Sequence, residues 1–86
     1  MDRPLLNEAL RDEAAVLRAF IGPDGDLRRI PTKLRKRIVV LNHVAQRFEP
    51  GRTWTELEVN AVLRDFHPDV AALRRHLVDE GFLDRQ

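Results

Sequence analysis

The chain has 86 residues, of which 43% are apolar and 34% are charged, and its formal net charge is +1. This length predicts one domain with a small core and excludes two. No apolar run approaches the roughly 20 residues that span a bilayer, and the acidic N-terminus does not resemble a secretory signal, so we expect a cytoplasmic protein. Cysteine, serine and tyrosine are absent, which excludes disulfides, thiolate metal sites and the commonest covalent nucleophiles.

The charge is distributed unevenly along the chain. Residues 1–26 carry six acids and three bases, residues 27–48 carry seven bases and no acid, and residues 49–86 carry eight acids and five bases. Asymmetry of this kind is informative about partners more than about fold. Six cations fall within ten residues and are called the basic cluster below: Arg28, Arg29, Lys33, Arg35, Lys36 and Arg37.

The first half of the chain predicts two helices. Apolar residues at three- and four-residue spacings predict a helix over about 7–21, and Gly22-Pro23-Asp24-Gly25 predicts a turn. Residues 27–30 are short enough to be extended. A second helix is expected from Pro31 or Thr32, with Thr32 as its cap. Its core stripe has a regular 4-3-4-3 spacing and comprises Leu34, Ile38, Leu41, Ala45 and Phe48. Three valines lie off this stripe, which predicts a central helix with neighbours on more than one side.

The second half predicts two further helices and a short strand. Thr55 and Glu58 have the spacing of a capping box, so a third helix is expected from about Glu56 to Phe66. The tryptophan before this box, Trp54, is the single tryptophan of the chain. It is a hydrophobic staple onto Val59 or a stacking platform for a nucleobase, and its position favours the staple.

A fourth helix is expected after the break at His67-Pro68, with Pro68 at its first position and Gly81 at its end. Residues 82–85 alternate in the manner of a short strand. A short helix, a tight turn, a second helix and a strand are the order of a winged helix-turn-helix. We therefore expect one mostly α domain over residues 1–86 with a minimal β element. It has an N-terminal helix and turn over 1–26, a winged-helix-like helix-turn-helix core over 27–86, and an incomplete wing.

Residues 30–85 resemble the bacterial family catalogued as domain of unknown function 2087. The resemblance rests on a basic helix start after Ile30-Pro31 and on ordered blocks further along: Phe48-Glu49-Pro50-Gly51, Glu58-Val59-Asn60, Leu73-Arg74-Arg75, Leu77-Val78-Asp79 and Gly81. It implies a helix-turn-helix domain with a link to transcription, because some members are attached to a separate repressor-type winged helix. Members usually continue into an aromatic, basic second strand, which does not follow Asp84-Arg85 here.

The titratable residues favour no enzyme and no metal site. His43, His67 and His76 are the only side chains that titrate near neutral pH. His76 and Glu80 have a spacing that holds a metal with two ligands, but no third ligand has a matching position. Acid-base pairs such as His67 with Asp69 come with no nucleophile, phosphate-binding loop or cofactor motif. We therefore expect a non-enzymatic protein without a cofactor.

The basic cluster is the strongest functional signal. Its cations lie at the start of a helix, where the dipole is already positive and each cation costs about 0.3–1 kcal/mol. Two explanations remain open: acids such as Asp24, Asp26 or those of the first helix compensate, or an anionic partner does. The favoured partner is a nucleic-acid backbone, with DNA preferred over RNA. On the fourth helix Arg75 and His76 would then reach into a groove, although acids on that helix oppose this role.

A protein-interaction module is the alternative function. The acidic fourth helix, the incomplete wing and the additional N-terminal helix favour it, because the apolar stripe of that helix can pair with a second copy. Leu10 and Leu17 are the residues expected to carry such a dimer. Nucleic-acid binding and dimerisation or docking therefore stand as competing predictions, and neither involves a membrane or a small-molecule substrate.

Overall fold

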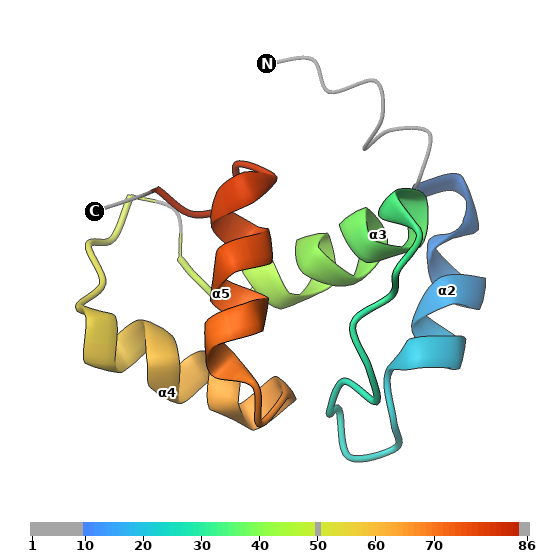
Figure 1. Cartoon of the computed structure of the whole chain (residues 1–86), viewed down its shortest axis with the longest axis horizontal. Coiled ribbons are helices and arrows are strands. Elements are labelled where there is room, and N and C mark those ends of the chain that lie inside the picture. The colour runs from blue at the N-terminus through green and yellow to red at the C-terminus, as the bar shows by residue number, and fades with distance from the viewer. Residues whose placement is uncertain (1–9, 50, 85–86) are drawn as a thin grey trace.

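The computed structural model describes residues 10–49 and 51–84. A single 3₁₀ turn, η1 (Leu10–Asp12), leads into α2 (Glu13–Phe20), which is followed by α3 (Leu34–Ala45), α4 (Glu56–Phe66) and α5 (Val70–Asp79). In Figure 1, α3 lies between α2 on one side and the pair of α4 and α5 on the other. The prediction of a mostly α domain is confirmed. Within the described residues the one β feature is an isolated antiparallel bridge between Ile21 and Leu27.

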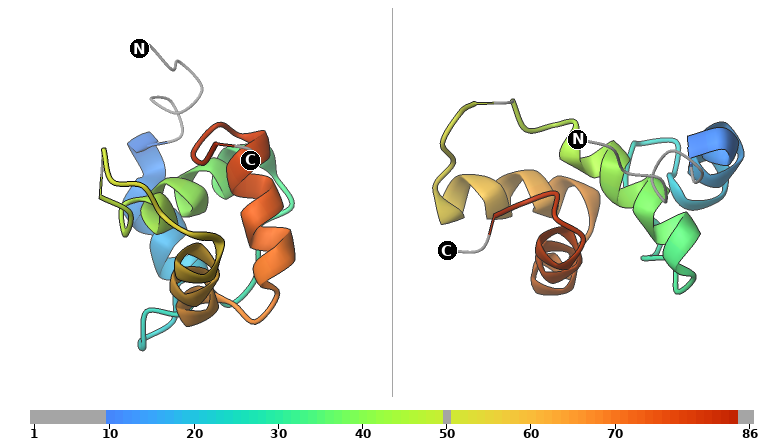
Figure 2. Two further views of the ribbon diagram at one scale, coloured as in Figure 1. Left: turned by 90° about the vertical axis from the view of Figure 1, so that its left-hand side faces the viewer. Right: turned by 90° about the horizontal axis from the view of Figure 1, so that it is seen from above.

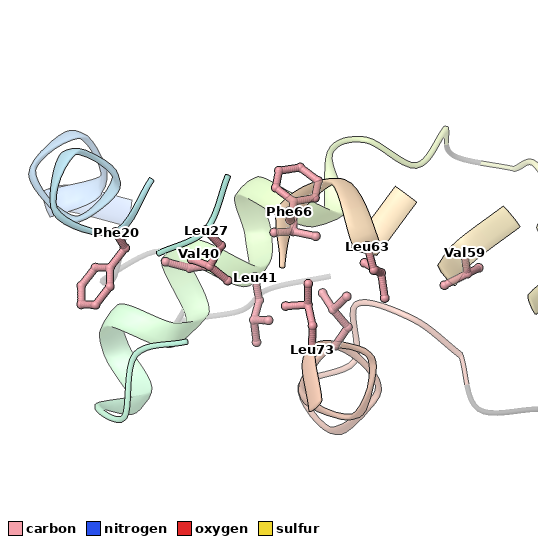
Figure 3. Packing of buried hydrophobic residues seen from close by; sticks show 10 residues of the cluster. Phe20, Leu27, Val40, Leu41, Val59, Leu63, Phe66 and Leu73 are labelled. Atoms are coloured by element: carbon pink, nitrogen blue, oxygen red, sulfur yellow. The ribbon is translucent and has the colours of Figure 1, made fainter. Parts of the chain in front are cut away.

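The helix α3 is central to the core. Its buried residues are Ile38, Val39, Val40, Leu41 and Val44. Ile38 and Val39 pack against partly buried residues of α2, and the other three join a cluster with buried residues of α4 and α5. Figure 3 shows Leu41 between Val40 on one side and Leu63 and Leu73 on the other. The predicted central position of this helix is therefore confirmed, and the valines off the stripe are buried because the helix has neighbours on two sides.

The first helix is shorter than predicted. Of the predicted range 7–21, residues 7–9 lie outside the described part, residues 10–12 form the tighter 3₁₀ turn, and α2 ends at Phe20. Ile21 leaves the helix because it pairs with Leu27. The turn predicted between them is confirmed: the N–H of Gly25 donates to the carbonyl of Gly22 over 3.0 Å. Gly25 has a φ of 85°, which a side chain would strain.

The observed bounds of the second helix differ from the prediction at both ends. The helix α3 begins at Leu34 with Lys33 as its N-cap, and not at Pro31 or Thr32. It ends at Ala45, since the N–H groups of Arg47 and Phe48 donate to carbonyls three residues earlier and form a tighter turn. Phe48 still packs on the core from that turn. Leu34, the first residue of the predicted stripe, is 40% exposed and contributes little to the core.

The start of α4 agrees with its prediction. The side chain of Thr55 accepts a hydrogen bond from the N–H of Glu58, and the carboxylate of Glu58 accepts one from the N–H of Thr55. These bonds to Thr55, with a smaller contribution from Arg52, lower the pKa of Glu58 below its ordinary value. Trp54 packs against the cluster that contains Val59, as a staple would. The capping box and the staple are therefore confirmed.

The bounds of α5 are partly as predicted. This helix begins at Val70 and not at Pro68, and Asp69 is its N-cap, because the Asp69 carboxylate accepts a hydrogen bond from the N–H of Ala72 over 3.1 Å. The end is confirmed: Gly81 has a φ of 78°. The N–H of Phe82 donates to the carbonyl of Leu77, and that of Gly81 to the carbonyl of Val78, which is a Schellman motif.

The predicted wing strand is wrong within the described residues. Residues 82–84 form bends and an irregular segment, and Arg85 lies outside the described part. The chain turns back at Gly81 and its apolar side chains, Phe82 and Leu83, pack on the core instead of pairing with a strand. The views in Figure 2 show this segment lying against the C-terminal end of α5. The winged-helix detail of the prediction is therefore not part of the observed fold.

Candidate nucleic-acid interface

The segment that leads into α3 is fixed by backbone hydrogen bonds on two sides. The N–H of Leu27 donates to the carbonyl of Phe66 over 2.7 Å, and the N–H of Arg28 donates to that of Phe20 over 2.8 Å. Leu27 is buried, whereas Arg28 and Arg29 are exposed. The guanidinium of Arg29 lies 5.1 Å from the centroid of the Phe20 ring, within cation–π range. The segment is thus tied to α2 and α4 in a position that leaves both arginines at the surface.

The first turn of α3 has no side-chain cap. Lys33 has the extended backbone of an N-cap residue, but its side chain makes no capping hydrogen bond, and the turn that follows contains no acid. Lys33, Arg35 and Lys36 are all exposed. Uncapped N–H groups give a helix start a partial positive charge, and an anion placed there is stabilised. Cations and helix dipole therefore add up to one positive surface at this end of α3.

Arg37 differs from the other members of the basic cluster. Its side chain is half-buried, and its Nη1 donates to the carbonyl of Thr32 over 2.9 Å and to that of Pro31 over 3.4 Å. Its Nε is buried and has no hydrogen-bond partner among the described residues. The guanidinium binds these two carbonyls ahead of the helix, and α3 begins later than the sequence predicts, after the extended Lys33. Arg37 is a positioning residue in this arrangement, which sequence reasoning alone did not predict.

Some of the acids predicted to compensate the positive charge of the basic cluster lie close to it. Asp12 lines a groove of about 420 Å³ between α2 and the start of α3, together with Lys33, Arg35 and Lys36. Asp24 and Asp26 are exposed on the preceding turn. The ion pairs Arg47–Asp65, Arg52–Glu58 and Arg74–Glu56 all lie away from the cluster. Among the described acids, Asp12 therefore lies beside the start of α3, and Asp26 lies close to Arg28 at Gly22.

On α5 the two arginines have different environments. Arg74 is half-buried and its Nη1 contacts the carboxylate of Glu56 on α4 over 3.0 Å. Arg75 is exposed. Arg74 thus lies at the edge of the core and Arg75 at the surface. The contact to Glu56 joins residues 18 positions apart, and no local pattern in the sequence predicts it.

His76 links α5 to the basic cluster. Partial burial is the main reason why its pKa lies below the ordinary value, and the charges of Arg37 and Arg75 lower it further, against Asp79 and Glu80. Arg37 acts on His76 because α3 and α5 pack against each other. His76 is therefore neutral at physiological pH and adds no positive charge to a nucleic-acid surface.

The structure groups the eight predicted site residues into three sets. Five of them are exposed: Lys33, Arg35 and Lys36 at the start of α3, and Arg28 and Arg29 in the segment before it, where they contact the end of α2. Arg37 lies inward and faces His76, and Arg75 lies outward on α5. The first set is the candidate interface. Arg37, on the first turn of α3, connects this interface to α5 through its charge interaction with His76.

The remaining histidines have structural contacts. The ring of His43 is half-buried and meets the ring of Phe66 edge-on with centroids 6.1 Å apart. The Nδ1 of His67 accepts a hydrogen bond from the N–H of Asp69 before α5. Among the residues that the structure describes, no three histidines, cysteines or acids are grouped as metal ligands. In the same residues no helix has the length and apolar character that a bilayer crossing requires.

The fold and this surface define a helical domain in which α4 and α5 pack against each other and α3 has a basic start. The chain belongs to the family of uncharacterized proteins conserved in bacteria named DUF2087, whose model matches residues 26–86. This confirms the resemblance found from residues 30–85 and extends it to the turn before the basic cluster. No curated protein and no solved structure matches the chain.

Proposed function

We propose that this chain is a cytoplasmic, non-enzymatic nucleic-acid-binding module associated with transcription. It binds the phosphate backbone, and DNA is the preferred partner. The observation that carries the proposal is the exposed, uncapped and cationic start of α3, preceded along the chain by the exposed Arg28 and Arg29. The helix dipole disfavours cations in this first turn, and an anion bound at the exposed helix start offsets that cost.

In this proposal the residues have three roles. Arg28, Arg29, Lys33, Arg35 and Lys36 contact phosphates. Arg37 holds the segment before α3 in position. In the helix-turn-helix formed by α4 and α5, Arg75 reaches toward a groove beside the half-buried His76. Because phosphate contacts dominate and base contacts are few, binding is weak, nearly independent of sequence and sensitive to salt.

Fluorescence anisotropy with labelled duplex DNA and duplex RNA, at two salt concentrations, tests the proposal. Five phosphate contacts predict a slope of about −4 to −5 for log K against log salt on B-DNA. Measurable affinity at about 50 mM salt that falls steeply at about 200 mM supports the proposal, and no binding at the lower concentration refutes it. Tighter binding to RNA than to DNA would overturn the preference for DNA.

A protein-interaction module keeps one observation in its favour. Leu57 on α4 is 82% exposed, which is unusual for a leucine in a small domain. The dimer predicted through the first helix has less support, because Leu17 packs against Ile38 and Val39 within the chain. The side chain of Leu10 lies outside the described part. Sedimentation of the free protein separates the two functions: a dimer without nucleic-acid affinity favours interaction, and a monomer that binds DNA favours the interface at α3.

A further inference from the structure

A half-open cavity of about 430 Å³ lies at the end of α3 opposite the basic cluster. Its described lining comes from the end of α3, residues 48–49 and 51–54, the start of α4, the end of α5 and the segment after α5. Its volume lies in the range of about 300–1,000 Å³ that small-molecule sites occupy. The apolar residues in its lining include Phe48, Trp54, Val59, Val78, Phe82 and Leu83. This combination of size and apolar surface is typical of a site for a small organic ligand.

Trp54 forms an aromatic wall of the cavity with Phe48. The two rings meet edge-on with centroids 5.0 Å apart, and the guanidinium of Arg52 lies 3.9 Å from the centroid of the Trp54 ring. The indole Nε1 is buried and has no hydrogen-bond partner among the described residues. Trp54 therefore contributes an aromatic surface to the cavity, and its buried indole N–H takes no part in ligand contacts.

Two arginines line the same cavity, and each has N–H groups that its ion pair does not use. Arg52 contacts Glu58 over 2.8 Å and Arg74 contacts Glu56 over 3.0 Å, each through one nitrogen. A guanidinium carries five N–H donors, and an exposed ion pair contributes only about 0–1 kcal/mol, so a second carboxylate can share these arginines at little cost. The acids of the lining without a described pair, Glu49 and Asp84, are exposed, where water and salt screen their charge.

We propose that this cavity binds a small organic carboxylate with an aromatic or branched apolar body. The body lies against Phe48 and Trp54, and the carboxylate accepts hydrogen bonds from the two arginines that line the cavity. The site is separate from the basic cluster, so the proposal does not depend on nucleic-acid binding.

Trp54 is the best reporter for this site, because the chain has one tryptophan and no tyrosine. Its emission is titrated with three probes that share a phenyl ring and differ in the polar group: 3-phenylpropionate, 3-phenylpropionamide and 2-phenylethylamine. We expect the carboxylate to change the emission saturably and to bind at least about tenfold more tightly than the amide, as a charge-assisted hydrogen bond predicts. Equal binding of acid and amide, tighter binding of the amine, or no response to any probe would overturn the proposal.

Two variants and a control locate the ligand. Arg74→Gln removes a donor pair and should weaken binding of 3-phenylpropionate by about tenfold or more. Val78→Phe fills part of the cavity and should abolish binding without a change in charge. Arg64→Gln removes an exposed arginine of α4 that does not line the cavity and should bind like the wild type. Circular dichroism verifies that each variant is folded. Wild-type affinity in both folded cavity variants would refute the site.

Discussion

The starts of α3 and α4 are built in opposite ways. The start of α4 has a Thr55 cap, acids Glu56 and Glu58 in its first turn, and reciprocal hydrogen bonds between Thr55 and Glu58. The start of α3 has Lys33 without a capping bond, no acid, and exposed cations in its first turn. The first arrangement satisfies the amides and the dipole of its own helix. At the start of α3, the residues of the first turn compensate neither the backbone amides nor the helix dipole.

This difference indicates what each helix start does. The capping box of α4 satisfies the start of its own helix without a partner. The start of α3 relies on tertiary support, because Arg37 fixes the preceding segment and the buried face of α3 packs against neighbours on two sides. Such a start is available to an external anion. The predictions below test this division, from the largest expected effect to the smallest.

Charge reversal at the start of α3 should have the largest effect. Arg35→Glu combined with Lys36→Glu removes two phosphate contacts and adds repulsion, so we expect DNA affinity at low salt to fall by more than about tenfold and the salt slope to lose about 2 units. The control, Arg18→Glu with Arg47→Glu, changes the net charge equally at exposed positions outside the basic cluster. An equal loss in both variants, measured by anisotropy, would show that only net charge matters.

Removal of the α4 cap should lower stability and leave the interface intact. Thr55→Ala is expected to reduce the free energy of unfolding by about 1 kcal/mol, as lost N-caps do. Thr32→Ala is the matched control, because Thr32 is exposed and α3 takes Lys33 as its N-cap instead. Urea unfolding followed by circular dichroism measures both. A larger loss for Thr32→Ala would contradict the observed start of α3.

A cap introduced at α3 should stabilise the helix and weaken binding. Lys33 already has the extended backbone of an N-cap, so Lys33→Asp supplies the missing acceptor and a favourable charge. We expect a gain of about 0.5–1 kcal/mol in the free energy of unfolding together with lower DNA affinity. Lys33→Gln removes the charge without adding an acid and should gain less stability. A Lys33→Asp variant that binds DNA as tightly as the wild type would separate this helix start from the interface.

The pH dependence of His76 should be the smallest effect. Because its pKa is lowered in the folded state, the unfolded chain binds more protons at pH values between that lowered pKa and the ordinary value of about 6.5. The contribution to stability is therefore present above the ordinary pKa and is lost as the pH falls through this window. His76→Gln should show a smaller loss of stability than the wild type between about pH 7.5 and pH 5 in urea unfolding. An unchanged difference would argue against the burial of His76 beside Arg37.

Local signals in the sequence predicted some elements fully and others in part. The capping box at Thr55 and the glycine end at Gly81 were predicted because all the necessary residues are contiguous. The start of α3 was placed too early, because the guanidinium of Arg37 binds the carbonyls of Pro31 and Thr32. The strand at 82–85 was wrong, since the Schellman turn at Gly81 directs Phe82 into the core and four alternating residues are a weak pattern.

The candidate interface was predicted at the level of charge and not of geometry. The run of six cations is visible in the sequence, and five of them are exposed as an interface requires. That Arg37 is a positioning residue, and that it faces His76, depends on the packing of α3 against α5. Likewise, the contact between Arg74 and Glu56 forms only when α4 and α5 are paired. Contacts between distant residues are not encoded in local periodicity, so the structure was needed to find them.

A comparison of Lys36→Glu with Arg75→Glu tests the central claim most directly. Both replacements reverse one exposed cation and change the net charge equally, but one lies at the start of α3 and the other on α5. Binding to the same labelled DNA duplex is measured by anisotropy at low salt. The account predicts a greater loss of affinity for Lys36→Glu than for Arg75→Glu. The opposite order would contradict it and would place the main nucleic-acid contact on α5.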